Sequence, residues 1–492
     1  MNTVTRQSLK YSLVGYGGSL LGILSTFFLF IYDLDFYGKL RFILPTAQMF
    51  LPIVVFGISF SNVKFFQMMQ RAGKHQNMLS LSLLAIVFNF LIFTLGFWLY
   101  GYIFPQYQNT ETWKLKNIIL PLILILALSA VFNKYISNYK RIAISNLFEN
   151  VFPKLANIGA FSLFFFMGFS EQGAYYLFIL VFLLALLGYY HYANRLESIK
   201  FDFSTTYLKE DQKWKPVLDY SFYGFLGNLG SYLALNIDYF MISEGIGFEE
   251  NGVYATVYSI VSLVSIPAMG LYNISAPIIN THFEEGTMDA LHRYHQKTSF
   301  HLFAVGLVLL SCLVVGFPYL TVYMPKNGAA ILSAQPLVWI IGSAVLFELA
   351  TGFNSHIISM SKYYRFNIVV MLILALFTIG LNYYFIHYTT LGIMGVALAY
   401  AISLTLFNLI KISFNYYQFK VFPLSIKMLS MLLVAGLGIG LAELLPEFKQ
   451  PWLNLGYKPL VVIAVLMLGN AVCHWLPFSE LRKFMKNNKA KH

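Results

Sequence analysis

Charged residues are scarce in this chain of 492 residues. Asp, Glu, Lys and Arg make up only 11% of it, about half the share found in soluble domains. Polar stretches long enough to fold as a separate soluble domain are also missing. The two cysteines, Cys312 and Cys473, lie inside apolar runs. This placement excludes a disulfide framework and a CxxC metal pair, and we interpret both residues as small buried hydrophobic groups.

Signatures of catalysis and of nucleic-acid binding are missing as well. No Gly-x-x-x-x-Gly-Lys-Ser/Thr loop is present for ATP hydrolysis. The histidines His282, His292 and His295 share one segment but lack the spacing of a metal site. The net charge of +12 comes from basic residues scattered between apolar segments, whereas a nucleic-acid surface needs them clustered. We therefore expect no enzyme, no cofactor, no metal and no nucleic-acid partner.

Apolar and aromatic residues dominate the sequence, at 58% and 18%. A helix needs about 20 apolar residues to cross the hydrocarbon layer of a membrane. On this measure the chain is an all-α polytopic membrane protein with about fourteen spans. They are predicted near residues 11–32, 42–63, 78–101, 117–137, 146–168, 173–192, 217–240, 252–280, 299–323, 331–357, 366–387, 391–412, 424–444 and 457–476.

The positions of Lys and Arg predict the orientation of these spans. Short loops rich in basic residues stay in the cytoplasm. With both termini inside, 25 of the 33 basic residues fall in cytoplasmic segments, 7 fall in external loops, and Lys154 alone lies inside a span. Moving the count by one span would spoil this asymmetry. The basic tail 479–492 can also rest on anionic lipid headgroups.

The two halves of the chain show a weak internal repeat. Residues 11–15 read Tyr-Ser-Leu-Val-Gly, and residues 220–224 read Tyr-Ser-Phe-Tyr-Gly. Both segments open a span, and spans one and seven run in the same direction. A parallel duplication of six spans has this topology.

Several short motifs, taken in order, resemble one transporter family. They are Phe36-Tyr37-Gly38, Asn236-Ile237-Asp238-Tyr239, Gly252-Val253-Tyr254, Ile266-Pro267, Ala276-Pro277 and Ser361-Lys362-Tyr363-Tyr364-Arg365. Their order and spacing resemble the polysaccharide transport family of the multidrug, oligosaccharidyl-lipid and polysaccharide exporter superfamily, which includes O-antigen flippases.

The resemblance implies two six-helix lobes around a central cavity, with alternating access. The lobes would be residues 1–200 (spans one to six) and 201–420 (spans seven to twelve), followed by two extra spans in 421–478. The implied function is to flip an undecaprenyl-pyrophosphate-linked oligosaccharide across the bacterial inner membrane, for O-antigen, lipopolysaccharide, capsule or exopolysaccharide biosynthesis. The expected partners are the lipid-linked substrate, membrane lipids, a polysaccharide polymerase and glycosyltransferases.

Lys154 and Glu348 are the first candidates for the transport pathway, because ionisable residues inside a membrane usually face a cavity. Lys154 follows Pro153 in the fifth span. It either contacts the anionic substrate, forms an ion pair with Glu149 or Glu348, or extends toward the cytoplasmic surface. Glu348 lies near Asn354 and His356. It either binds a coupling H⁺ or Na⁺, pairs with Lys154 in one state, or is a protonated structural carboxyl.

Further candidates lie near the ends of spans. Two alternatives are open for Asp238. It makes a structural or gating contact, or it is solvated at the external membrane surface. Arg41 and Lys39 either receive the pyrophosphate at the external mouth or are solvated. Arg365 either attracts the incoming substrate or serves only as a topology signal.

Three other functions are alternatives to this one. A multidrug exporter of the same superfamily would need acidic or aromatic cavity groups, so Lys154 weighs against it. A peptidoglycan-precursor flippase is a further relative that composition leaves open. A polysaccharide polymerase or ligase would need a large external loop, and the longest predicted ones, near 102–116 and 445–456, have about fifteen residues or fewer.

Overall fold

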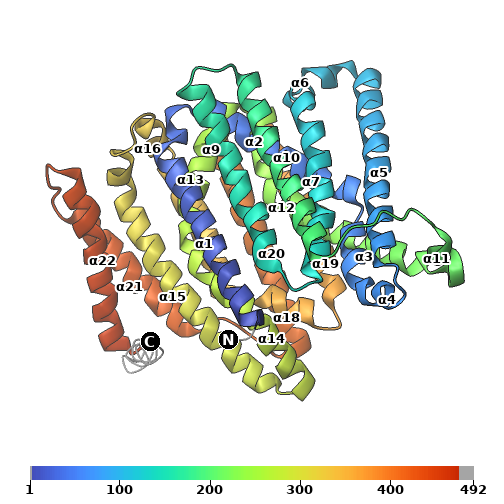
Figure 1. Cartoon of the computed structure of the whole chain (residues 1–492). Helices are drawn as coiled ribbons and strands as arrows, with labels where there is room; N and C mark the ends of the chain where they lie inside the picture. The colour runs from blue at the N-terminus through green and yellow to red at the C-terminus, as the bar shows by residue number, and fades with distance from the viewer. Residues whose placement is uncertain (1–2, 476–492) are drawn as a thin grey trace. The chain divides into compact units, whose positions relative to one another are not determined.

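The computed structural model describes residues 3–475, so the predicted basic tail 479–492 lies outside the described residues. The described chain is helical and contains no strand, which confirms the all-α polytopic fold (Figure 1). Contacts between helices divide it into two compact units. Unit 1 comprises Met1–Ser259 and Arg365–Ser403, and unit 2 comprises Ile260–Tyr364 and Leu404–His492. The proposed lobes 1–200 and 201–420 stay a prediction.

Unit 1 contains the N-terminal helices and two that come much later in the chain. Its elements are α1 (Thr3–Phe28), η1 (Phe30–Tyr32), α2 (Leu34–Val55), α3 (Ile58–Lys64), α4 (Phe66–Arg71), α5 (His75–Ile103), η2 (Pro105–Asn109), α6 (Glu111–Lys114), α7 (Lys116–Ser137), α8 (Ile142–Asn146), η3 (Leu147–Val151), α9 (Phe152–Phe165), α10 (Glu171–Leu196), α11 (Thr206–Lys209), η4 (Glu210–Gln212), α12 (Trp214–Gly245), most of α13 (Phe248–Val261), α19 (Tyr364–Tyr388) and the first part of α20 (Ile393–Phe419).

Unit 2 is smaller and is built around the long helix α15. Its elements are η5 (Ser262–Ser265), α14 (Ile266–Glu285), α15 (Met288–Thr321), α16 (Gly328–Ser333), α17 (Gln335–Thr351), α18 (Asn354–Met360), the second part of α20, α21 (Ile426–Leu444) and α22 (Pro451–Cys473). Helix α15 packs against α17, α21 and α22.

Most of the predicted spans correspond to one long apolar helix each. Within the described residues, eleven helices are long and apolar enough, and the bent pair α17–α18 makes a twelfth. The two predicted spans that fall short are 146–168 and 217–240. The first falls on α8, η3 and α9, which follow one another without a break from Ile142 to Phe165. The second lies in α12, whose 32 residues include many Gly, Ser, Tyr and Asn. Helices that are long and apolar enough by themselves therefore match eleven or twelve of the fourteen predicted spans, and the other two predicted spans also fall on helix.

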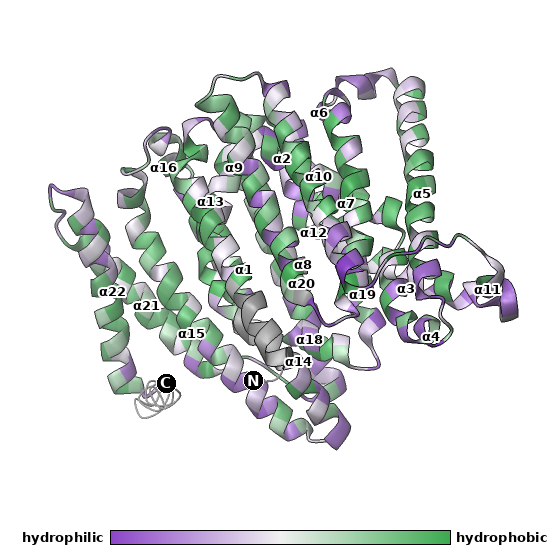
Figure 2. Ribbon diagram, in the orientation of Figure 1, coloured by the Kyte–Doolittle hydropathy of each residue, from purple (hydrophilic) through white to green (hydrophobic). Residues whose placement is uncertain are grey.

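Long helices of unit 1 expose apolar side chains on their outer surfaces. Helix α5, for example, exposes Phe88, Leu91 and Leu95 by about 60% each. Exposing such side chains to lipid carries no free-energy penalty, and the helix forms all of its backbone hydrogen bonds internally. Hydrophilic residues gather instead at short elements such as α4 and α11 (Figure 2). The second cysteine departs from its prediction, because Cys473 is exposed and not buried.

Helix α2 approaches α12 and α13 at backbone distance, and glycines make this approach possible. A β-carbon on Gly38 would collide with the carbonyl of Phe248, and one on Gly252 would collide with the carbonyl of Leu34. At the other end of α2, Gly57 adopts φ +69° against the Ser221 carbonyl. Small residues allow such close helix packing in membranes. These glycines therefore fix α2 and its continuation against α12 and α13.

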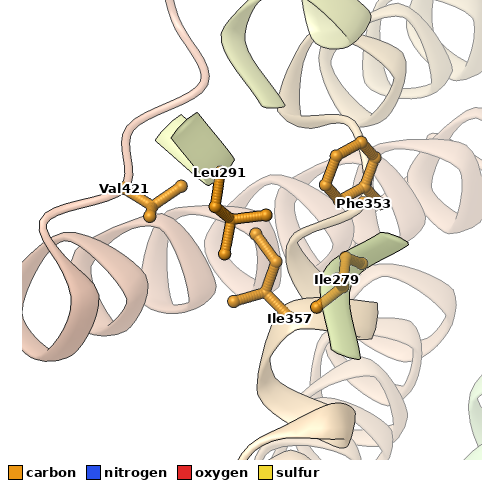
Figure 3. Close-up of a cluster of buried hydrophobic side chains, with 5 residues drawn as sticks. All are labelled: Ile279, Leu291, Phe353, Ile357 and Val421. Atoms are coloured by element: carbon orange, nitrogen blue, oxygen red, sulfur yellow. The ribbon is translucent and has the colours of Figure 1, made fainter. Parts of the chain in front are cut away.

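An apolar cluster of unit 2 packs beside the bend between α17 and α18. The two helices meet at 48°, and Gly352, with φ +59°, lies at the break. Figure 3 shows the side chains that pack beside it, contributed by α14, α15, α18 and the segments next to α18 and α20. This cluster consists of Ile279, Leu291, Phe353, Ile357 and Val421, all fully buried. A left-handed glycine at the bend avoids the strain that a β-carbon would cause there.

Candidate functional site

Arg41 and Lys154 are two cations of unit 1 that form no ion pair with a carboxylate among the described residues. Arg41 belongs to α2. Its guanidinium carbon lies 4.2 Å from the centroid of the Tyr239 ring, and its buried Nε has no acceptor. Lys154 belongs to α9, where its Nζ donates a 2.7 Å hydrogen bond to the carbonyl of Asn150. Both predicted cations are therefore held by a ring or a carbonyl rather than by a carboxylate.

An irregular stretch of helix positions Lys154. The π-helical segment η3 immediately precedes α9, and Pro153 occupies the first turn of α9. The aliphatic part of the Lys154 side chain extends along α1. A β-carbon on Gly22 would lie 3.1 Å from the Cε atom of Lys154. Gly22 thus leaves the room that the side chain occupies. Single π-helical turns often occur at functional sites.

The two cations are close enough to affect each other. The charge of Arg41 repels that of Lys154. Like charges held together in partly apolar surroundings are unfavourable, and an anion placed near both would relieve the repulsion. The arrangement is therefore suited to an anionic group.

Lys39 has a different environment from Arg41, although both lie on α2. Its Nζ lies 2.9 Å from Asp35 on the same helix and 2.7 Å from Glu171 at the start of α10. The charge of Lys39 is therefore neutralised within the protein, and the residue links α2 to α10. Its predicted role in receiving pyrophosphate stays a prediction.

Asp238 is buried inside unit 1 at a junction of three helices. Its carboxylate accepts a 2.7 Å hydrogen bond from the amide of Asn382 on α19 and a 3.0 Å hydrogen bond from the hydroxyl of Tyr254 on α13. The alternative that Asp238 is solvated at the surface is wrong, since its exposed fraction is 6%. The next residue, Tyr239, carries the Arg41 guanidinium, so α12 connects the carboxylate to the cation.

Glu348 in unit 2 faces a cation that sequence reasoning did not select. Lys411, on α20, is only 3% exposed and attracts the Glu348 carboxylate without forming an ion pair. Its Nζ donates a 2.8 Å hydrogen bond to Ser355 and lies 3.6 Å from the centroid of the Phe407 ring. Lys154 belongs to unit 1, and its pairing with Glu348 stays a prediction.

Asn354 is the centre of a fully buried polar group in unit 2. Its Oδ1 accepts hydrogen bonds from Asn415, at 2.8 Å, and from His295, at 3.2 Å. All three residues have an exposed fraction of 0%. This network joins α15, α18 and α20 and explains why Asn354 and His295 are tolerated in an apolar interior.

Arg365 lies at the start of α19 in unit 1. Its guanidinium carbon is 4.5 Å from the centroid of the Tyr223 ring on α12. The contact resembles that of Arg41 with Tyr239, with a planar cation over an aromatic face. Attraction of the incoming substrate stays a prediction for this residue.

Lys411 was missed because it falls at the end of the predicted span 391–412 and was counted with the cytoplasmic basic residues, and His295 because it precedes the predicted span 299–323. Basic residues beyond an apolar run were assigned to cytoplasmic segments. In the structure, α20 continues to Phe419 and α15 begins at Met288, so both side chains lie inside packed helices. The polar residues Asn408 and Asn415, at three and four residues from Lys411, are a helical-face signal that could have found it.

The described chain is thus a multi-pass, all-α membrane protein with polar side chains held inside two helical units. Its fold is shared by known transporters. The lipid II flippase MurJ, in an inward closed conformation, matches with a TM-score of 0.70 and 15% identity, covering 94% of this chain and 98% of that one. A multidrug resistance MATE family transporter of the MOP superfamily, in an inward-facing conformation, matches with a TM-score of 0.59 and 16% identity, covering 85% and 95%.

Similarity in sequence is more limited. No protein-family model matches the chain. An uncharacterized membrane protein, EpsK of Bacillus subtilis (strain 168), is 27% identical over 187 residues. That match spans 38% of this chain and 36% of the length of EpsK. The comparisons therefore establish the fold that this chain shares with MurJ and MATE transporters.

Proposed function

We propose that this protein is a flippase that moves an undecaprenyl-pyrophosphate-linked oligosaccharide across the bacterial inner membrane. The observation that carries the proposal is the pair Arg41 and Lys154, two cations held inside unit 1 without a carboxylate partner among the described residues. A cation in an apolar interior is costly unless an anion compensates it. The pyrophosphate of a lipid-linked sugar would supply that charge.

The fold is consistent with this task. The chain shares its helical arrangement with MurJ, a lipid II flippase, and lipid exposure of helices such as α5 would let a polyprenyl tail stay in the bilayer. In the proposed cycle, the sugar and pyrophosphate pass through the protein by alternating access. Both termini are cytoplasmic, and the product feeds a polysaccharide polymerase after glycosyltransferases have built it.

We propose H⁺ or Na⁺ as the coupling ion. Asp238 and Glu348 are the carboxylates available for it. Asp238 already has two hydrogen-bond donors, Asn382 and Tyr254, whereas the Glu348 side chain accepts no hydrogen bond from the described residues. Protonation of either carboxyl group would change its attraction for neighbouring groups, and for Glu348 the affected neighbour is Lys411.

A peptidoglycan-precursor flippase is the second candidate, and the extensive overlap with MurJ favours it. Its substrate would also satisfy the two cations, so the charge argument does not separate it from the first proposal. A multidrug exporter is less well supported, because a cationic drug would be repelled by Arg41 and Lys154. The nature of the glycan is what distinguishes the two flippase proposals.

Depletion of the protein tests the proposal directly. We expect an undecaprenyl-pyrophosphate oligosaccharide to accumulate on the cytoplasmic face, identified by mass spectrometry of extracted lipids. Accumulation of lipid II instead would favour the second candidate. In complemented cells, Lys154→Ala should abolish export at normal protein levels, while Lys154→Arg retains part of it. Lys449→Ala, which removes an exposed loop cation, is the matched control. Full export by Lys154→Ala would overturn the charge argument.

A further inference from the structure

A cavity of about 390 Å³ is lined in part by residues of η2 and α6 in unit 1. Figure 1 shows the position of α6. The cavity lies between the connection from α5 to α7 and the turn from α12 to α13. Both segments belong to loops predicted to be external. The lining residues are Gln106, Asn109, Thr110, Glu111, Ser243, Glu244, Ile246, Gly247 and Phe248. Its volume is within the range of small-molecule sites in proteins.

The two carboxylates of this cavity are already engaged. Glu244 accepts hydrogen bonds from the backbone N–H groups of Glu111 and Thr112, at 2.9 and 2.8 Å, and from the Thr112 hydroxyl at 2.6 Å. Glu111 forms an ion pair with Lys114 at 2.6 Å. These contacts occupy most of the acceptor positions of the two carboxylates, so few oxygens remain to bind a cation. The remaining negative charge disfavours a pyrophosphate.

Uncharged polar groups, by contrast, are available. The carboxamides of Gln106 and Asn109 form no hydrogen bond to another described residue. The hydroxyl of Ser243 is buried, with an exposed fraction of 4% for the residue, and has no partner. Each carboxamide offers donors and an acceptor side by side, and a hydroxyl offers both. The side chains of Phe248 and Ile246 contribute apolar surface to the cavity lining.

From this combination we propose that the cavity is an exit-side binding site for a sugar residue of the transported glycan. A neutral sugar presents adjacent hydroxyl groups that both donate and accept hydrogen bonds, and an apolar ring face, which match the exposed carboxamides of Gln106 and Asn109 and the apolar side chains of the lining. The volume accommodates one or two sugar rings. The inference rests on the proposed function, since it assigns a place to the glycan of that substrate.

The position of the cavity connects it to the glycine contacts of α2. Phe248 lines the cavity, and the carbonyl of the same residue touches Gly38. A sugar bound against Phe248 therefore contacts the segment that seals α13 against α2. Binding there would hold the glycan outside after the pyrophosphate has left Arg41, and so reduce its return.

Saturation-transfer NMR on the full chain in nanodiscs tests the site, with glucose, N-acetylglucosamine and N-acetylgalactosamine as probes. We expect saccharide binding that is at least tenfold weaker in Gln106→Leu/Asn109→Leu. Asn117→Leu makes the same chemical change on an exposed residue at the start of α7, outside the cavity, and should bind like the native chain.

The failure of this proposal is distinguishable from failure of the proposed function. Absence of saccharide binding, or equal binding by the double variant, overturns the site even if Lys154→Ala abolishes export. Lys154→Ala should retain saccharide binding, because Lys154 does not line the cavity. If Lys154→Ala exports normally while the double variant loses binding, the site stands and the charge argument is what fails.

Discussion

The guanidinium of Arg41 stacks on the ring of Tyr239, with 4.2 Å between the guanidinium carbon and the ring centroid. Tyr239 follows Asp238, whose carboxylate is bonded to two further helices. The aromatic face stabilises the arginine without neutralising it, because a cation–π contact leaves the net charge unchanged. Arg41 is therefore positioned by unit 1 and still able to attract an anion.

Replacing Arg41 by Ala should lower the transport rate at least about tenfold, equivalent to about 1.4 kcal/mol. Arg41→Lys should give an intermediate rate, because it keeps the charge and loses the planar stacking. The rate is measured with a fluorescent lipid-linked sugar in proteoliposomes. Arg71→Ala, on the exposed end of α4, should transport normally. A native rate in Arg41→Ala would exclude this residue from the pathway.

Replacing Gly252 by Ala should destabilise unit 1 by about 1–3 kcal/mol, because the new methyl group would collide with the Leu34 carbonyl. The expected readout is a lower thermal unfolding temperature in nanodiscs. Gly380→Ala provides the control, since a β-carbon there meets no atom within 4 Å. It should leave the unfolding temperature unchanged or slightly raised. Equal effects of the two substitutions would contradict the close backbone approach.

Replacing Lys39 by Met should cost stability of about 1 kcal/mol or less, because its ion pairs with Asp35 and Glu171 are partly exposed. Transport should be largely retained, in contrast to Arg41→Ala. The double variant Lys39→Glu/Glu171→Lys should recover part of the unfolding temperature. A loss of transport in Lys39→Met at normal stability would place Lys39 in the pathway after all.

The stability of the α5–α10 junction should depend on pH through Glu197. Burial works to raise the pKa of this carboxyl, but hydrogen bonds from Tyr139, His75 and Gln76 outweigh burial and hold the pKa below its usual range. A carboxyl with a depressed pKa in the folded state stabilises the fold above its unfolded pKa, near about 4.3. The contribution is lost as the pH falls through the folded value.

The corresponding measurement is the unfolding temperature of Glu197→Gln between pH 7 and pH 3. The variant should unfold earlier than the native chain at pH 7, and the gap should close below about pH 4. Glu249→Gln, at an exposed carboxylate, should show no such gap. A difference that stays constant down to pH 3 would mean that the Glu197 charge is not responsible.

The fold class was predictable from the sequence because the membrane requirement is strong. Long apolar helices follow from hydropathy alone, as α5 and α15 show. The apolar runs also placed spans at 146–168 and 217–240, where the structure has continuous helix from α8 through η3 to α9 and the long helix α12, although polar residues make α12 less apolar than the other spans. Spans that carry polar or irregular structure give the weakest hydropathy signal.

The candidate site was only partly predictable. Lys154 was found because an isolated cation inside an apolar run is conspicuous, and Asp238 because of its motif. The partners of these residues come from distant segments of the chain, as the contact of Asp238 with Asn382 shows. A local sequence pattern cannot predict such contacts. Lys411 was missed because its apolar run ends where the lysine appears, although the helix continues for two more turns.

The π-helical segment η3 has a consequence for the angular register of α9. In a regular α-helix each residue turns the chain by about 100°, so one additional residue in a wide turn rotates everything after it by about that angle. Lys154 is the third residue after η3. Deleting a single residue from Leu147–Val151 would therefore turn Lys154 away from Gly22 and Arg41 while leaving the amino acids of the site intact. The direction in which the Lys154 side chain points therefore depends on the number of residues in η3 as well as on the lysine itself.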